Sequence, residues 1–214
     1  MINNIQIYGE RCSGTNYLEN LIKKNFDITI TSKYGWKHFF GFNELNDNEN
    51  TLFICIVRNP VDWFNSLYRE RHHLPINFSN LNNFLNSEVI STRDNGTIIY
   101  EDKNLMNKNK YYKNLFELRH IKLKYLIDIL PNLVKNYILI KYEDLINNYE
   151  KTMEKIKSFN LKLNENIVFP ENHYLYKSTQ NKFNNNIKKN NLDKNLILNN
   201  TNFYTYYEKK LNYI

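Results

Sequence analysis

Near its start, the chain carries a strand pattern that leads through a small polar loop directly into a helix pattern. Apolar residues dominate Ile5–Tyr8, the loop spans Gly9–Gly14, and apolar residues recur at helical spacing within Thr15–Asn25. In such a unit the backbone N–H groups of the loop and of the first helical turn point at one place, where the helix dipole also favours negative charge. The sequence therefore predicts an anion-binding loop between a buried strand and the helix that follows it.

The spacing of the two loop glycines matches the first part of a Walker A phosphate-binding loop. Two later positions do not match, because Thr15 stands in place of lysine and Asn16 in place of serine or threonine. That lysine normally holds the β- and γ-phosphates, and that hydroxyl normally binds Mg²⁺. We therefore expect the loop to hold a phosphate group and to be poorly suited to hydrolysing a nucleoside triphosphate.

Strand and helix patterns alternate along most of the chain. The run Thr51–Val57 (TLFICIV) is apolar without interruption, which is typical of a strand buried on both faces of a parallel sheet. We expect strands at 5–8, 27–31, 51–57 and 137–141, and helices at 15–25, 60 to about 71, 117–130, 145–159 and 204–211. This alternation predicts an α/β fold, a single P-loop-like domain over residues 1–214 with a central, mostly parallel sheet flanked by helices. Residues 75–115 are expected to form a variable insertion, and 181–200 an Asn/Lys-rich low-complexity segment.

The 214-residue chain has a formal net charge of +7, from 29 basic and 22 acidic residues. This excess favours a polyanionic ligand such as a nucleotide or a sulfated sugar. The charge is not concentrated enough to require nucleic acid, and we expect no nucleic-acid partner. Many of the lysines lie in Asn/Lys/Ile-rich stretches, so a compositional bias of the source genome explains the same excess.

The two cysteines, Cys12 and Cys55, lie in the loop and in an apolar strand pattern, which argues against a disulfide framework. Neither cysteine has the spacing of a metal ligand. The N-terminal segment lacks the basic and apolar regions of a signal peptide, and no apolar run approaches the roughly 20 residues that span a bilayer. We therefore expect a soluble, cytoplasmic protein with no metal requirement and no membrane partner.

A second informative segment follows the apolar run Thr51–Val57. Arg58 stands at the carboxyl end of that strand, where open α/β sheets bind ligands, and Ser66 lies about two turns into the following helix. A guanidinium offers a phosphate two parallel N–H donors, and a serine hydroxyl adds one more. An arginine paired with a nearby carboxylate and a serine on a helix face would give the same pattern, so the residues alone leave both interpretations open.

Together these segments resemble the sulfotransferases that use 3′-phosphoadenosine 5′-phosphosulfate (PAPS). In that family a strand–loop–helix near the N-terminus, often containing Lys/Arg-Ser-Gly-Thr, binds the 5′-phosphosulfate, and a segment R-x-P-x-D-x-x-x-S-x-Y binds the 3′-phosphate. Here the second segment is Arg58–Tyr68, with every motif position filled. A third segment, Tyr142–Leu145 (YEDL), is similar to the family's strand-end Y-E-D-L and implies that Tyr142 lies near the adenine. The resemblance covers roughly residues 5–160 in the right order.

The resemblance implies cofactor-binding roles for the loop, for the Arg58 segment and for residues later in the chain. These residues are Arg11, Cys12, Ser13, Gly14, Thr15, Asn16, Arg58, Ser66, Tyr142 and Lys177. Lys177 is included because basic residues late in family members close over the 3′-phosphate. In one departure, Cys12 directly precedes Ser-Gly-Thr, where many members have the basic residue, and Arg11 stands one position earlier. Arg11 is expected to reach the transferring group through a changed backbone or to leave that role to another residue.

Sulfuryl transfer to an alcohol needs an in-line acceptor oxygen, a base for its proton, and cations for the charge on the leaving phosphate. Lys37 and His38 supply both kinds of group, near the position where soluble sulfotransferases carry a Lys-x-His or similar pair. His38 is the expected base, because an imidazole pKa near ~6.5 suits proton abstraction at neutral pH. Lys37 is expected to stabilise the bridging oxygen, with Lys33 as a second candidate, and Arg11 completes the catalytic set. Glu10 is the alternative base, since some branches of the family use a glutamate.

The predicted function is transfer of a sulfuryl group from PAPS to a hydroxyl or amine of a small-molecule or glycan acceptor. The expected nucleotide product is adenosine 3′,5′-bisphosphate, and no metal is required. Two alternatives stay open: a P-loop kinase-like phosphoryl transferase, which would bind its nucleotide with magnesium, and a non-catalytic polyanion-binding module. The module would show steep salt dependence without turnover. The sequence leaves the acceptor and the oligomeric state open.

Overall fold

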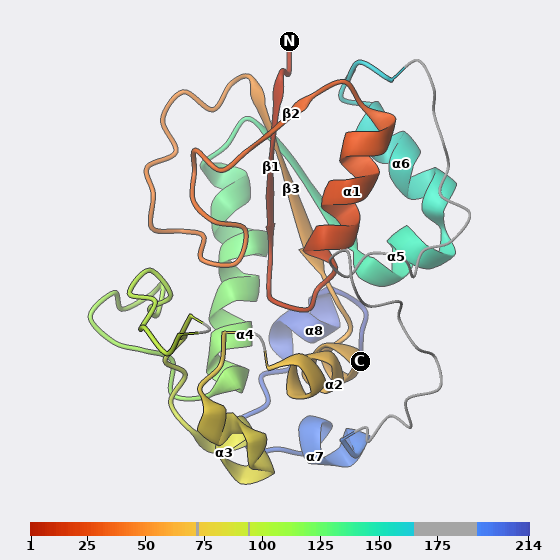
Figure 1. Ribbon diagram of the computed structural model, residues 1–214. Coiled ribbons are helices and arrows are strands. Elements are labelled where there is room, and N and C mark those ends of the chain that lie inside the picture. The colour runs from red at the N-terminus through yellow and green to blue at the C-terminus, as the bar shows by residue number, and fades with distance from the viewer. Residues whose placement is uncertain (72, 94, 165–191) are drawn as a thin grey trace.

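A computed structural model describes residues 1–71, 73–93, 95–164 and 192–214. Its centre is a four-stranded, all-parallel sheet with the strand order β2-β1-β3-β4, and helices lie on both sides of it (Figure 1). The strands are β1 (Asn4–Gly9), β2 (Thr29–Thr31), β3 (Thr51–Val57) and β4 (Asn136–Lys141). The α-helices are α1 (Thr15–Asn25), α2 (Pro60–Glu70), α3 (Leu81–Asn86), α4 (Leu115–Lys124), α5 (Tyr142–Asn147), α6 (Tyr149–Lys157), α7 (Lys194–Leu198) and α8 (Tyr206–Lys210). The α/β fold expected from the sequence is confirmed.

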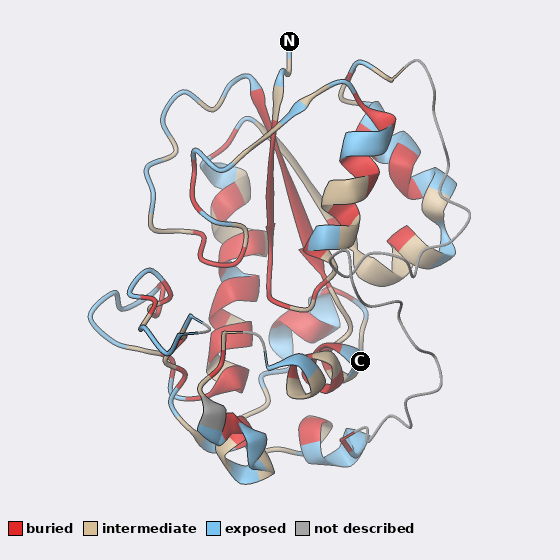
Figure 2. Cartoon of the chain, in the orientation of Figure 1, coloured by how far each residue is buried: buried red, intermediate tan, exposed pale blue. Residues whose placement is uncertain are grey.

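The uninterrupted apolar run of β3 is explained by two separate cores, one on each face of the sheet. Phe53 and Cys55 contribute to the core that includes residues of α2 and α4. Ile54 and Ile56 point to the opposite face and contribute to the core formed with α1, α5 and α6. Side chains alternate between the two faces along a strand, so when both faces are covered, successive side chains are all buried and apolar. Figure 2 shows the result, with the central strands buried and the helices exposed on their outer faces.

The parallel register brings the carboxyl ends of the strands to one edge of the sheet. Gly9 of β1 lies beside Ile56 of β3, and Val57 lies beside Lys141 of β4. The chain leaves this edge through three segments: the loop into α1, the turn into α2 and the start of α5. In an open α/β sheet, this edge is where ligands bind.

The turn from β3 into α2 follows the helix-start chemistry expected from the sequence. The side chain of Asn59 accepts from the backbone N–H of Val61 at 3.0 Å and of Asp62 at 3.5 Å, and Pro60 occupies the first helical position. An asparagine cap satisfies amides that the helix itself leaves unpaired, and proline has no amide to satisfy there. The end of β3 is therefore joined to α2 without a flexible connection.

Two expected helices differ from the prediction. The helix expected over 117–130 is α4 followed by a π-helical turn η2 (Tyr125–Ile129) and a 3₁₀ turn η3 (Leu130–Asn132), because Pro131 has no N–H to continue the α-helical bonding. The helix expected over 145–159 is the pair α5 and α6. Asn148 leaves the helical conformation between them, with φ −130° and ψ 46°.

The expected insertion at 75–115 contains little regular structure. It holds a 3₁₀ turn η1 (Ile76–Ser79), α3, and isolated antiparallel bridges that join Val89 to Tyr112 and Thr92 to Ile98. Of the low-complexity segment expected at 181–200, residues 181–191 lie outside the described part of the chain, and α7 forms within the remainder. Among the helices of the described residues, none combines the length and apolarity needed to cross a membrane.

Candidate active site

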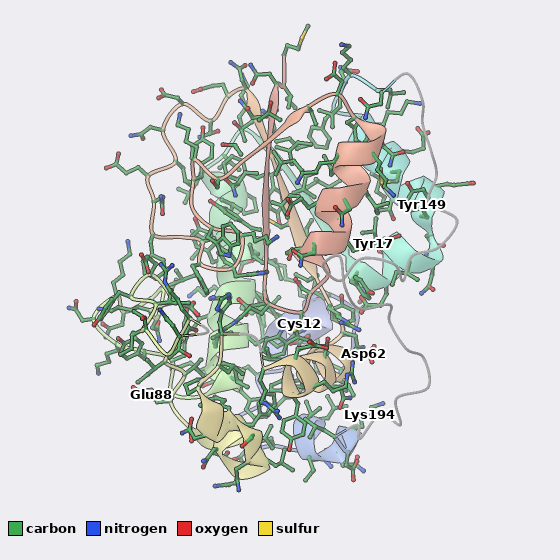
Figure 3. The ribbon with its side chains drawn as sticks, viewed as in Figure 1. Cys12, Tyr17, Asp62, Glu88, Tyr149 and Lys194 are labelled. Atoms are coloured by element: carbon green, nitrogen blue, oxygen red, sulfur yellow. The ribbon has the colours of Figure 1, made fainter. Side chains whose placement is uncertain are left out.

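The loop that joins β1 to α1 is held in a conformation that requires glycine at its last position. Gly14 has a φ of 98°, in the left-handed region that favours glycine. A Cβ at this position would also overlap the ring of Tyr142, the first residue of α5. Cys12 in the same loop has a φ of 62°, and Figure 3 shows it between the lower end of the sheet and α2. The loop therefore packs closely against the end of β4.

Arg58 lies between this loop and the aromatic ring beside it. Its NH1 atom donates to the carbonyl oxygen of Cys12 at 3.0 Å, and its guanidinium carbon lies 4.5 Å from the ring centre of Tyr142. A guanidinium over an aromatic face is attracted by the electron density of the ring. The Nε atom of Arg58 is buried and has no hydrogen-bond partner among the described residues. Three segments that the sequence singled out thus meet at one point.

Ser66 reaches the same loop from α2. Burial raises the pKa of the Cys12 thiol, and a hydrogen bond with Ser66 acts in the opposite direction. Ser66 and Arg58 therefore both contact residue 12, one through its side chain and one through its backbone carbonyl. The two residues expected to share one phosphate therefore both neighbour Cys12.

The N-terminus of α1 is open to a negative charge. Its N-cap residue, Gly14, makes no side-chain cap hydrogen bond, and the first turn contains no acidic residue. Lys37 extends toward this turn, where its Nζ donates to Asn16 Oδ1 at 2.5 Å and to Glu19 Oε2 at 2.9 Å. The amides, the dipole and the ammonium group together favour an anion at this place. Ser13 is turned inward, with its hydroxyl donating to the carbonyl of Glu10 at 2.5 Å, and Thr15 is buried.

Arg11 differs from the expectation of direct contact with the transferring group. Its side chain is fully buried, and its NH1 donates to Ser91 Oγ at 2.8 Å and to the carbonyl of His73 at 3.2 Å. Its NH2 lies 3.4 Å from Oδ2 of Asp102 in an ion pair. The indole of Trp63 donates to the Arg11 carbonyl at 2.7 Å, which fixes the backbone at this position. The arginine therefore ties the loop to the insertion.

Four charged side chains form a buried cluster beneath the loop, which we call the charge cluster: Glu10, Arg11, Asp102 and Lys122. Lys122 has no exposed side-chain surface, and its Nζ lies 2.7 Å from Asp102 Oδ1 and 3.2 Å from Glu10 Oε1. Burial raises the pKa of Glu10 against the pull of Lys122 and Arg11, whereas for Asp102 these two cations overcome burial and lower the pKa. Asp102 has the shorter contact to Lys122 and also accepts a hydrogen bond from the Ser91 hydroxyl, which Glu10 lacks. Asp102 thus carries the negative charge, and Glu10 holds a proton more readily than an exposed glutamate.

His38 is buried at the end of β1 with its ring orientation set by one hydrogen bond. Its Nδ1 lies 2.8 Å from the carbonyl oxygen of Gly9, and since a carbonyl only accepts, Nδ1 carries the proton and Nε2 keeps the lone pair. Burial lowers the pKa of His38 to about 3, the bond to Gly9 opposes this, and nearby Lys37, Arg11 and Lys122 lower it further. The imidazole is therefore neutral at physiological pH, although it is a weaker base than an ordinary histidine.

The structure brings together the loop, Arg58, Ser66 and Tyr142, and it places Lys37 at the start of α1. It turns Arg11 away from them. Lys177 lies outside the described residues. Within the described ranges, no group of three or more His, Cys, Asp or Glu residues could hold a metal ion. Asp102 and Lys122 were missed from the sequence, because a buried charge leaves no pattern that distinguishes it from a surface one.

The fold and this edge define the class of protein: an α/β protein with a glycine-containing loop, which leads into a helix, at the carboxyl edge of a parallel sheet. In comparisons with known proteins, no family model matches the chain, and a search of curated proteins found no match. Among solved structures, the chain is similar to the crystal structure of mouse sulfotransferase SULT7A1 complexed with PAP, with a TM-score of 0.41 and 19% sequence identity. The similarity covers 74% of this chain and 58% of the mouse chain, so this chain spans little more than half of that protein.

Proposed function

We propose that the chain is a sulfotransferase that takes the sulfuryl group of PAPS and transfers it to a hydroxyl or amine acceptor. The observation that carries the proposal is the position of Arg58 between the loop carbonyl of Cys12 and the ring of Tyr142. Three sequence segments that the family uses for one nucleotide thereby meet at a single edge of the sheet. A simple surface salt bridge would require neither the loop nor the aromatic ring.

The residues present fit a nucleotide phosphorylated at both the 5′ and the 3′ position. The open N-terminus of α1 suits the 5′ group, and Lys37 adds a positive charge there. Arg58 offers a buried Nε without a partner in the described part of the chain, and Ser66 also neighbours Cys12. A guanidinium at this position offers a 3′-phosphate parallel N–H donors. The ring of Tyr142 provides an aromatic surface for the adenine.

In the proposed reaction the acceptor oxygen or nitrogen forms a bond to sulfur while the bond from sulfur to the 5′-phosphate oxygen breaks. The α1 amides and Lys37 stabilise the charge that develops on the leaving phosphate. The proton of the acceptor passes to a base, and His38 presents Nε2 for it because Nδ1–H is held by Gly9. Glu10 is the alternative base, and its raised pKa makes its ionised form a stronger proton acceptor than an ordinary glutamate.

Thermal unfolding with added nucleotides tests the proposal without knowledge of the acceptor. A ligand at a hundredfold excess over its Kd stabilises the folded state by about 2.7 kcal/mol, which raises the Tm of a domain of this size by roughly 5–10 °C. Adenosine 3′,5′-bisphosphate should give this shift in EDTA as well as in magnesium, and ATP should give little in either. A shift with Mg-ATP alone would favour the phosphoryl transferase, and no shift with either nucleotide would favour the polyanion-binding module. Screening acceptor classes with labelled PAPS then identifies the acceptor.

A further inference from the structure

The peptide unit between Arg58 and Asn59 has both of its polar groups bound by side chains. The carbonyl oxygen of Arg58 accepts from Arg119 NH2 at 2.8 Å. The N–H of Asn59 donates to Oε1 of Glu143 at 2.8 Å. These two partners come from α4 and α5, on opposite sides of the turn. The plane of this one peptide is therefore fixed from both ends.

Each of these two side chains is in turn held by the segment Tyr206–Tyr213. Glu208 receives two hydrogen bonds from Arg119, from Nε at 2.6 Å and from NH2 at 2.9 Å, and the side chains of this pair are 4% and 2% exposed. Tyr213 donates its phenol O–H to Oε2 of Glu143 at 2.9 Å. Figure 1 shows α8 and the C-terminus below the carboxyl edge of the sheet, and α8 contacts α4, which carries Arg119. A segment late in the chain thus holds both partners of the Arg58–Asn59 peptide.

This peptide lies at the base of the Arg58 side chain. Arg58 is the first residue after β3 and Asn59 caps α2, so the peptide forms part of the two-residue connection between the strand and the helix. The two hydrogen bonds fix ψ of Arg58 and φ of Asn59, and so hold the backbone from which the Arg58 side chain extends to the loop carbonyl of Cys12 and the ring of Tyr142. Arg119 also packs against the turn, with its guanidinium carbon 5.1 Å from the Trp63 ring centre.

We propose that Glu208 and Tyr213 are positioning residues, which act through Arg119 and Glu143 to hold the Arg58–Asn59 peptide and so direct Arg58 at the 3′-phosphate. The inference rests on the proposed function for the identity of the ligand. We call the four hydrogen-bonded side chains Arg119, Glu143, Glu208 and Tyr213 the clamp. The clamp predicts a second effect that needs no ligand: Glu143 and Tyr213 protect the Asn59 amide from hydrogen exchange.

The test compares two phenol deletions in the same segment. Tyr213→Phe removes only the hydroxyl that holds Glu143, and Tyr207→Phe removes a hydroxyl that donates to Asp128 at 2.5 Å, away from the Arg58 peptide. Calorimetric titration gives the affinity for adenosine 3′,5′-bisphosphate and the affinity for adenosine 5′-phosphate, and the first is divided by the second. Tyr213→Phe should lower this ratio by about 3- to 10-fold, as expected for one lost hydrogen bond, and Tyr207→Phe should leave it within about twofold. Equal ratios in the two variants would overturn the proposal.

Amide hydrogen exchange at Asn59, measured without nucleotide, separates failure of the clamp from failure of the proposed function. Exchange in Tyr213→Phe should accelerate by about 3- to 10-fold over wild type, with Tyr207→Phe unchanged. If Tyr213→Phe does not fold, Glu143→Gln replaces it in the test. This variant keeps an acceptor oxygen for the Asn59 amide but loses the charge, so it should also accelerate exchange at Asn59. If exchange at Asn59 is unchanged in Tyr213→Phe and in Glu143→Gln, the clamp is overturned. Faster exchange in a chain that does not bind the bisphosphate supports the clamp and rejects the nucleotide.

Discussion

Arg11 belongs to the loop between β1 and α1 and Arg58 contacts that loop, but the two side chains differ in burial and in partners. Arg11 is fully buried and pairs with Asp102 and Ser91 of the insertion. Arg58 is half-buried, and its guanidinium carbon lies 4.5 Å from the ring centre of Tyr142. Among the residues the structure describes, the Nε atoms of both arginines are buried without a hydrogen-bond partner, so this atom does not distinguish them. A buried, paired charge stabilises the fold, because its removal leaves the opposite charge unpaired in a low-dielectric interior. A guanidinium that is only half-buried at the loop can be reached by a ligand. The family resemblance implied a cofactor-binding role for both arginines, with the alternative that Arg11 leaves its role to another residue.

The largest expected effect is on the Arg11 side of this comparison. Asp102→Asn removes the negative charge shared by Arg11 and Lys122 and should lower the free energy of unfolding by about 3–5 kcal/mol. Denaturant unfolding measures this loss. The control is Asp128→Asn, whose partner Lys210 is exposed and which should change the unfolding free energy little. Similar losses in the two variants would show that the charge cluster does not support the fold.

The next effect concerns the Arg58 side. Arg58→Ala should weaken binding of adenosine 3′,5′-bisphosphate by about 2–4 kcal/mol, roughly 30- to 1000-fold, as expected for a lost charge-assisted pair. Binding of adenosine 5′-phosphate should change much less, and so should the free energy of unfolding. Arg58→Lys keeps the charge but not the planar stack on Tyr142 and should fall between wild type and alanine. An equal loss for both nucleotides would show that Arg58 does not bind the 3′ group.

A smaller effect follows from burial of His38, whose pKa is lowered to about 3. Between pH 6.5 and 3 the unfolded chain binds a proton at this residue that the folded chain does not, so folding becomes less favourable as the pH falls. The contribution of His38 to the unfolding free energy is complete above pH 6.5 and is lost by at most about 1.4 kcal/mol per pH unit below it. His38→Asn can keep a donor to the Gly9 carbonyl and does not titrate. Urea unfolding of both proteins from pH 4 to 8 should give a steeper acid loss for wild type, and parallel curves would contradict the burial.

The smallest expected effect is an absence of pH dependence in turnover. Because the pKa of His38 is about 3, kcat with a confirmed acceptor should stay constant between pH 5 and 8 if His38 is the base. An ordinary histidine would instead give a rise in rate near pH 6.5. If a rise with pH is observed, persists in His38→Asn and disappears in Glu10→Gln, the base is Glu10. The profile therefore separates two groups that lie side by side at the end of β1.

Much of the fold, and the placement of Arg58 near Tyr142, could be predicted because residues close together in the sequence specify them. The bounds of α1 and β3 match the prediction residue for residue, since helical periodicity and a continuous apolar run are unambiguous signals. The cap at Asn59 follows from residue types that have one common use. Arg58 and Tyr142 could be brought together because parallel strands end at the same edge of a sheet.

The Arg11 side could not be predicted, because its partners come from distant segments without a periodic pattern. Ser91 and Asp102 lie 80 and 91 positions beyond Arg11 in an insertion with little regular structure. Nothing in the sequence around Lys122 separates a buried lysine from one on the exposed face of a helix. The ordinary pKa assigned to His38 from its residue type was likewise changed by packing.

The order of the strands in the sheet has a consequence for the way the molecule assembles. Register partners in β1 and β3 are about 47 positions apart, as for Asn4 and Thr51, and those in β3 and β4 are 84 apart, as for Leu52 and Asn136. Contacts between distant positions form slowly, because a long loop must close before they contribute. During synthesis β1 and β3 can pair before β4 exists, whereas Tyr142 and Tyr213 arrive later still. The carboxyl edge of the sheet around Arg58 should therefore be the last part of the molecule to become native. Refolding followed by binding of the proposed nucleotide should lag behind refolding followed by burial of the β1–β3 core.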